Sequence, residues 1–213
     1  MACIAQARLA VLLALLALSL ISSACTEAIY RSMNDPARDE WQQPAAVVQA
    51  LKIEPGAFVA DLGAGGGYFT FPLAHATGPA GRVYAIDTEQ ESLRFIREEG
   101  ARRGGLPPNV ELVLATSDAS GLPSKSVDLI FACNTYHHLS NRPVYMKDLA
   151  RHLRAGGRVA IIDFKPSGWF WLLGHATVKE EVREEMTKAG YRLIEDFAFL
   201  ERQHFQVFAV AAP

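Results

Sequence analysis

The sequence predicts an α/β fold with a mostly parallel sheet, and three observations support this. Short apolar runs alternate with helical segments over most of the 213 residues, which is the pattern of strands joined by helices. A glycine-rich turn joins the first of these strands to the helix behind it. The last two strands follow each other with no room for a helix between them, so they pair as an antiparallel hairpin.

The N-terminus differs in kind from the rest of the chain. Residues 1–24 hold one charged side chain, Arg8, and then an apolar run from Leu9 to Ile21 that is shorter than the about 20 residues of a membrane span. Small residues precede Cys25, and this resembles the lipobox of bacterial lipoproteins, although Ser22 stands where Leu is usual. We therefore expect residues 1–24 to be a lipoprotein-type signal peptide, with cleavage before Cys25 and lipid on its thiol.

This expectation places the mature protein in the cell envelope, anchored in the membrane and facing the periplasm or the exterior. The alternatives are an ordinary signal peptide, an uncleaved anchor, or an apolar N-terminus without a targeting role on a cytoplasmic protein. Processing would leave only Cys133 free, which excludes an intramolecular disulfide and a cysteine-based zinc site. The net charge of -2 gives no electrostatic case for nucleic acid as a partner.

After Cys25, residues 25–43 are polar and are expected to form a tether that becomes an N-terminal flap near Trp41. In the alternative, these residues are a linker whose Trp41 only covers the core. Residues 44–213 are long enough for one domain of ordinary size, and the folded domain is expected there.

The predicted sheet is organised around the stretch FVADLGAGGGYFT, residues 58–70. A strand over 58–61 leads into a glycine-rich turn and then a helix over 68–76. Glycines allow a sharp turn and a close approach to a ligand, and the helix N-terminus offers free N–H groups, so this unit is typical of nucleotide binding. The dinucleotide pattern G-x-G-x-x-G is broken at Tyr68; the spacing is instead Asp61-x-Gly63-x-Gly65-x-Gly67.

The remaining elements alternate along the chain. Helices are expected over residues 44–51, 90–103, 141–154 and 178–190. Strands are expected over residues 82–87, 110–115, 127–133, 158–163, 191–200 and 205–211.

Polar residues follow the predicted strands at the edge where ligands of open α/β sheets bind. Asp87 ends its strand, where an acid accepts hydrogen bonds from ribose hydroxyls, unless it only caps the next helix. Asp118 lies in the loop after the third predicted strand. It either meets a ligand there or only caps its own turn. Asn134 is placed to meet a cofactor or substrate.

Two histidines, His137 and His138, come next in the same loop. Either could take a proton from a substrate, and the alternative is that they only stabilise the loop. We expect no metal, because the sequence fixes no third ligand beside them. Residues 169–173 are apolar and could pack in the core, line an apolar substrate pocket, or rest on a membrane surface.

Together, these motifs resemble the class I S-adenosylmethionine-dependent methyltransferases of the small-molecule type over residues 44–213. The acidic glycine motif, Asp87, Asp118, the Gly156-Gly157 turn and the final hairpin follow one another in that family's order. The resemblance implies a Rossmann-like seven-stranded sheet in the order 3-2-1-4-5-7-6, with the last strand antiparallel and helices on both faces.

The resemblance also implies S-adenosyl-L-methionine as the cofactor. Its methionine part would lie near Asp61, its ribose near Asp87 and its adenine near Asp118. The full set of residues implied to bind it is Asp61, Gly63, Ala64, Gly65, Gly67, Asp87, Thr88, Asp118, Ala119 and Asn134.

The implied reaction moves a methyl group to an oxygen, nitrogen, sulfur or carbon nucleophile of a small molecule, and the apolar stretch 169–173 favours an apolar one. Scarcity of cysteine argues against arsenic as the acceptor. Two alternatives stay open at this point. One is a nicotinamide-dependent oxidoreductase, since Asp87 would serve there equally. The other is a non-catalytic envelope lipoprotein that kept the fold, because S-adenosylmethionine is made in the cytosol.

Overall fold

The computed structural model describes residues 27–167, 171 and 174–212. The predicted signal peptide, Cys25 and most of the apolar stretch 169–173 lie outside this part of the chain. The α-helices, with gaps in their numbering, are α2 (Arg38–Gln42), α3 (Pro44–Leu51), α4 (Thr70–Thr77), α5 (Gln90–Arg102), α6 (Arg142–Leu149) and α8 (Lys179–Lys188). The strands are β1 (Phe58–Leu62), β2 (Arg82–Asp87), β3 (Val110–Leu114), β4 (Val127–Cys133), β5 (Leu153–Phe164), β6 (Tyr191–Phe197) and β7 (Gln203–Val210). Two 3-10 helices are η1 (Tyr136–His138) and η2 (Ala150–His152).

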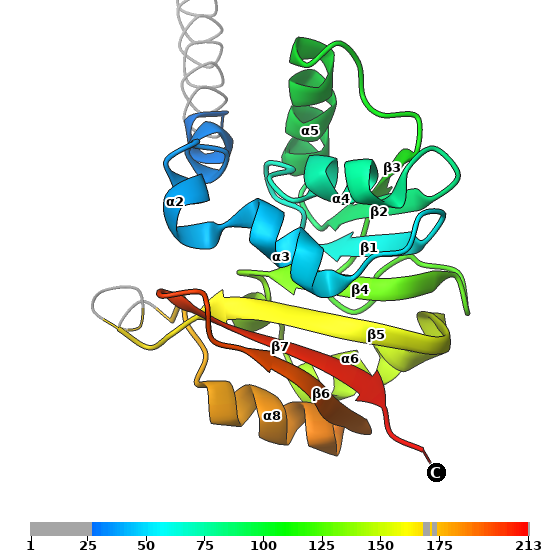
Figure 1. Cartoon of the computed structure of the whole chain (residues 1–213), viewed down its shortest axis with the longest axis vertical. Coiled ribbons are helices and arrows are strands. Elements are labelled where there is room, and N and C mark those ends of the chain that lie inside the picture. The colour runs from blue at the N-terminus through cyan, green and yellow to red at the C-terminus, as the bar shows by residue number, and fades with distance from the viewer. Residues whose placement is uncertain (1–26, 168–170, 172–173, 213) are drawn as a thin grey trace, which may run out of the picture.

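One seven-stranded sheet runs through the molecule in the order β3-β2-β1-β4-β5-β7-β6 (Figure 1). Strands β1 to β5 pair in parallel, and β7 is antiparallel to both β5 and β6. This confirms the predicted fold class, including the strand order and the terminal hairpin. Because the five parallel strands leave the sheet at one edge, the loops that follow them meet there.

Helices cover both faces of the sheet, as predicted (Figure 1). In β4, Leu129 and Phe131 pack in one core with α3 and α4, whereas Ile130 and Ala132 pack in the other with α6 and α8. Helix α5 covers the α4 face at the β2 side of the sheet, where it packs on Ala85. Burial on both faces explains why these strands are continuous apolar runs rather than alternating ones.

The predicted element boundaries were wrong in several places. The helix expected from Tyr68 begins at Thr70, because the glycine-rich turn extends further. The helix expected over 141–154 ends at Leu149, and β5 begins at Leu153, so Gly156 and Gly157 lie inside the strand.

The buried His152 accounts for the early end of that helix. Its Nδ1 lies 2.9 Å from the carbonyl oxygen of Pro123, and Leu153 directly after it pairs with Val127 of β4. The hairpin strands are also shifted: β6 ends at Phe197 and β7 begins at Gln203.

The segment before α3, where a tether and flap were expected, contains two helical stretches. Residues 27–33 form a helix, and α2 follows after a turn over 34–37. Arg38 of α2 lies over the ring of Tyr68 at 4.1 Å, and the Tyr68 hydroxyl donates to Asp39 at 2.5 Å. These contacts fix the segment against the glycine-rich turn. None of the described helices is long and apolar enough to cross a membrane.

Candidate functional site

A cavity of about 820 Å3 lies at the carboxyl edge of the parallel strands. Its walls come from six places: the turn after β1, the end of β2, the loop after β4, the end of β5, the segment before α8, and the N-terminal segment 30–41. Seven of the ten residues predicted to bind a cofactor line it, so the predicted edge is where the cavity forms. These seven are Asp61, Gly63, Ala64, Gly65, Asp87, Thr88 and Asn134.

Glycine is required in the turn after β1 because other parts of the chain approach it closely. Gly63 has φ +71°, and a Cβ there would lie 2.3 Å from Oγ1 of Thr135. A Cβ on Gly66 would lie 2.7 Å from Oδ1 of Asn34, whose Nδ2 donates to the Gly66 carbonyl at 2.5 Å. Glycine at these two positions therefore lets Thr135 and Asn34 pack against the turn, and both glycines also line the cavity. Gly67 lies behind it against Ile96 and is not among the lining residues.

Asp61 is a buried acid without a cationic partner. Its side chain accepts one hydrogen bond, from Oγ1 of Thr70 at 2.6 Å. Burial raises the pKa of Asp61 to about 7, and the nearby negative charge of Asp87 adds to the rise. Among the residues that the structure describes, no lysine or arginine pairs with it. A buried carboxyl of this kind at a cavity wall suits a ligand that brings its own positive charge.

Asp87 organises the turn as well as lining the cavity. Its Oδ2 accepts from the backbone N–H of Gly65 at 2.8 Å, and its Oδ1 accepts from that of Glu89 at 3.0 Å. The contact with Glu89 is the helix-starting role that the sequence left as an alternative. Each carboxylate oxygen retains a further lone pair, so the structure is compatible with both roles.

Asp118 and Ala119 are not brought to the cavity. Asp118 is exposed, and Ala119 closes a tight turn by a bridge to Thr116. Neither residue lines the cavity. This geometry corresponds to the alternative in which Asp118 belongs to its own turn.

Sequence reasoning missed most of the N-terminal wall. Tyr30 stacks against Phe95 of α5 with ring centroids 5.6 Å apart, and Met33 faces Gly65. Trp41 stacks against Phe164 at 5.7 Å. Each of these residues except Phe95 lines the cavity. The signal available in the sequence was the presence of large apolar side chains in an otherwise polar segment.

The loop after β4 forms the floor of the cavity. Asn134 adopts a left-handed conformation with φ +56°, and its Oδ1 accepts from Nε2 of Gln203 at 2.5 Å. The Sγ of Cys133 lies 2.9 Å from Nε2 of Gln42. Burial raises the pKa of the Cys133 thiol far above its usual range, so this cysteine is not a nucleophile at neutral pH.

Three histidines gather on the remaining wall. His137 and His138 come from η1, and His175 comes from the segment before α8. The ring centroids of His137 and His138 are 4.1 Å apart, and that of His175 lies 5.6 Å and 5.5 Å from them. All three line the cavity. Burial lowers the pKa of His138, and the neighbouring His137 and His175 lower it further.

A buried carboxylate orients the first of these rings. Nδ1 of His137 lies 2.7 Å from Oδ1 of Asp163, which is fully buried at the end of β5. With Nδ1 engaged by this carboxyl group, Nε2 is the ring nitrogen of His137 that no hydrogen bond in the described part of the chain engages. No local pattern indicates that His175 joins this group, since α6 and β5 lie between it and His138 in the chain.

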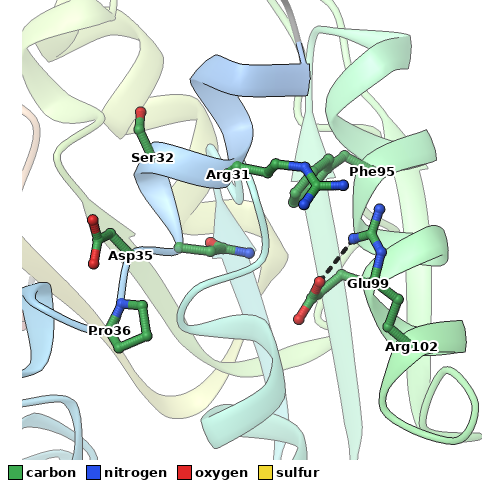
Figure 2. Close-up of a pocket in the computed structure, with 8 residues that line it drawn as sticks. Arg31, Ser32, Asp35, Pro36, Phe95, Glu99 and Arg102 are labelled. Carbon is green, nitrogen blue, oxygen red and sulfur yellow. Dashed lines mark hydrogen bonds and ion pairs between the residues drawn. The ribbon is translucent and has the colours of Figure 1, made fainter. Parts of the chain in front are cut away.

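A second pocket, of about 460 Å3, lies between the N-terminal helical segment and α5. Figure 2 shows Arg31, Phe95 and Arg102 around it, with Arg102 reaching Glu99. Arg31 pairs with Glu27 at 2.7 Å, and Arg102 pairs with Glu99 at 2.9 Å. The positive charges of this pocket are therefore already compensated, and it offers no comparable unpaired group.

The family described as "Methyltransferase domain" matches residues 60–161, which run from β1 into β5. This match covers a little under half of the chain, so the region from β1 into β5 is similar to a methyltransferase domain. A solved S-adenosylmethionine-dependent methyltransferase from Aquifex aeolicus has a TM-score of 0.80 and 25% sequence identity, and covers 87% of this chain and 98% of that one. A Bordetella parapertussis structure described as a possible exported protein has a TM-score of 0.62 at 14% identity, which shows the fold alone.

Curated relatives of the domain are methyltransferases by name. The ubiquinone/menaquinone biosynthesis C-methyltransferase UbiE of Burkholderia multivorans is 26% identical over 120 residues, which are 56% of this chain and 48% of that protein. An arsenite methyltransferase of Halobacterium salinarum is 27% identical over 155 residues, 67% of this chain and 39% of that protein. The chain thus spans about half the length, or less, of these relatives.

The family and the fold imply S-adenosyl-L-methionine as the cofactor of the methyltransferase domain. The site fits this molecule, because Asp61 offers an unpaired buried carboxyl to a ligand with a positive sulfonium and ammonium. Gly63, Gly65 and Gly66 of the glycine-rich turn line the same cavity as Asp61. A nicotinamide dinucleotide, the alternative left open above, would bring a pyrophosphate to the glycine-rich turn, where its negative charge would oppose a charged Asp61.

Proposed function

We propose that this protein transfers the methyl group of S-adenosylmethionine to a small molecule bound in the same cavity. The observation that supports this most is Asp61, a buried acid that no described lysine or arginine pairs with, on the wall of a cavity that histidines also line. Similarity of fold alone would not require a buried acid and several histidines around one cavity.

On the cofactor wall, the chain binds and orients rather than reacts. S-adenosylmethionine, when bound, supplies an electrophilic methyl group on a sulfonium. Asp61 would hold the positively charged methionine part, and the backbone at Gly63 and Gly65 would pack against it. Asp87 would accept from the ribose hydroxyls with its remaining lone pairs. Asp118 as a partner of adenine stays a prediction from the sequence.

On the acceptor wall, aromatic and imidazole groups meet. Trp41 and Phe164 supply apolar surface, and His137 and His138 supply ring nitrogens. This combination suits a small, largely apolar molecule with one ionisable group. Transfer then depends mainly on alignment of donor and acceptor, because the methyl group is already activated. Nothing in the described residues fixes whether the nucleophile is oxygen, nitrogen, sulfur or carbon.

Calorimetric titration of the purified chain with S-adenosylhomocysteine tests the cofactor part of this proposal, with NADH as the matched control ligand. We expect saturable binding of S-adenosylhomocysteine at one site and no heat from NADH. Absence of binding at saturating S-adenosylhomocysteine would leave the non-catalytic alternative, a lipoprotein that kept the fold. If S-adenosylhomocysteine binds, mass spectrometry of ligands that co-purify with the protein would identify the acceptor class.

We also propose that the mature protein is a lipoprotein of the cell envelope, anchored through lipid on Cys25. The support is the sequence pattern of residues 1–25. An exported enzyme would need a supply of S-adenosylmethionine outside the cytosol. Intact-mass measurement after membrane fractionation, on wild type and Cys25→Ser, tests this. An unprocessed wild-type chain in the soluble fraction would favour the cytoplasmic alternative.

A further inference from the structure

We propose that His137, His138 and His175 form a binding site for a transition-metal ion, with Zn2+ as the best-fitting ion. One ring nitrogen from each residue lies within 4.8 Å of those of the other two. This departs from the expectation of no metal, which rested on the lack of a third ligand beside His137 and His138. The fold supplies that ligand from the segment before α8.

The rings are available for coordination. His137 uses Nδ1 for Asp163 and keeps the lone pair of Nε2. In the described part of the chain, no hydrogen bond engages the ring of His138 or of His175. Three imidazoles this close would repel one another if protonated, whereas neutral rings around a cation attract it.

Asp163 holds the two halves of the site together. Its Oδ1 accepts from His137 at 2.7 Å, and its Oδ2 accepts from Oγ1 of Thr177 at 3.0 Å. Thr177 lies two residues after His175, and its carbonyl accepts from Nε2 of His204 at 3.0 Å. A carboxylate behind a metal-binding histidine fixes the ring orientation and raises its basicity, so Asp163 is a positioning residue.

Three imidazole nitrogens match the preference of zinc, and a three-histidine set leaves a fourth position open. Zinc at about 2.0–2.1 Å from each nitrogen requires nitrogen separations of about 3.4 Å, so small side-chain rotations complete the site. All three histidines line the large cavity, and the open position is therefore accessible to a molecule bound there.

The position of the metal site in the cavity suggests a chemical class for the methyl acceptor. This part of the inference rests on the proposed function. A hydroxyl or thiol at the open position would have its pKa lowered by the metal and would release its proton to solvent. The oxygen or sulfur lone pair would then form the new bond to the methyl carbon, as the carbon–sulfonium bond breaks and its electron pair returns to sulfur. No histidine has to act as a base in this scheme.

The test is a zinc titration of the metal-free, full-length chain, purified without a polyhistidine tag and followed by competition with a chromophoric chelator. We expect one zinc per chain. His138→Ala and His175→Ala should each weaken zinc affinity by at least about tenfold, and His75→Ala, an exposed histidine of α4, should not change it. Co2+ in place of Zn2+ should give the intense absorption bands of a tetrahedral site, and both cluster variants should lose them.

Asp163→Asn should weaken zinc affinity by about 10- to 100-fold and shift the cobalt bands. A shift of the bands while cobalt still binds reports a changed ligand orientation, which a loss of packing alone would not produce. Zinc that binds the two cluster variants as tightly as wild type, or does not bind at all, would overturn the inference. S-adenosylhomocysteine is titrated into the same metal-free sample. If S-adenosylhomocysteine binds and zinc does not, the metal site is wrong and the proposed function stands. If zinc binds and S-adenosylhomocysteine does not, the metal site stands and the proposed function is wrong.

Discussion

The two walls of the cavity are built in different ways. The cofactor wall consists mainly of one short stretch, with Asp61 at the tip of β1 and the glycine-rich turn directly after it, to which β2 adds Asp87. The histidine wall joins η1, the end of β5 and the segment before α8, and one carboxylate, Asp163, links them. A wall made from one stretch of chain can be recognised in the sequence, whereas a wall assembled from three distant segments emerges only with the fold.

The largest expected effect concerns the close packing of Gly63, in the cofactor wall, against Thr135. Gly63→Ala should lower the free energy of unfolding by about 2–5 kcal/mol, because it combines a left-handed backbone with a clash against Thr135. Gly56→Ala is the matched control, since φ is +87° there but a Cβ meets nothing within 4 Å. Its cost should be only about 1–2 kcal/mol. Urea denaturation measures both, and equal losses would show that the Thr135 contact is unimportant.

The next effect tests the charge on the cofactor wall. Asp61→Asn should weaken S-adenosylhomocysteine binding at least about 30-fold, because it removes the buried partner of a positive group. Asp118→Asn, which changes an exposed side chain outside the cavity, should leave the affinity unchanged. Calorimetry on both variants checks the assignment. A larger loss in Asp118→Asn would return the adenine site to the position implied by the sequence.

Protonation of Asp61 predicts a pH dependence of the same binding step. Its pKa of about 7 means that the free protein holds a proton there at lower pH, and that proton must leave when a cationic ligand binds. The dissociation constant should therefore rise by nearly tenfold per pH unit as the pH falls below about 7, and flatten above it. Asp61→Asn should abolish this slope. A slope that persists in the variant would assign it to the histidines instead.

The smallest expected effect tests whether the cofactor wall and the histidine wall act independently in binding. His138→Ala and His175→Ala should change S-adenosylhomocysteine affinity by less than about twofold, because each site lies on its own wall and distant sites act independently. The same calorimetric titration measures this. A loss comparable to that of Asp61→Asn would mean that the walls are not independent.

The sequence predicted the strand order and the position of the cavity because both follow from local patterns. Buried strands, the glycine turn and the final hairpin each leave a signal within a few residues. The end of α6 was missed because it depends on His152 and on the pairing of Leu153 with Val127, a contact across the sheet.

Side-chain placement was predicted less well, for the same reason. Asp118 fitted a family position but is turned into solvent by its own tight turn. The residues of the N-terminal wall act only through packing on α5 and the glycine turn, which no local pattern encodes. His175 reaches its partners through Thr177 and Asp163, so its role could be seen only in three dimensions.

The direction of β7 has a consequence for protein engineering. Because this strand runs against its neighbour β5, its beginning rather than its end reaches the ligand edge, and Gln203 there holds Asn134 of the cavity floor. Replacing residues 201–203, in the turn that leads into β7, would thus alter this part of the cavity while the glycine-rich turn after β1 keeps its native sequence.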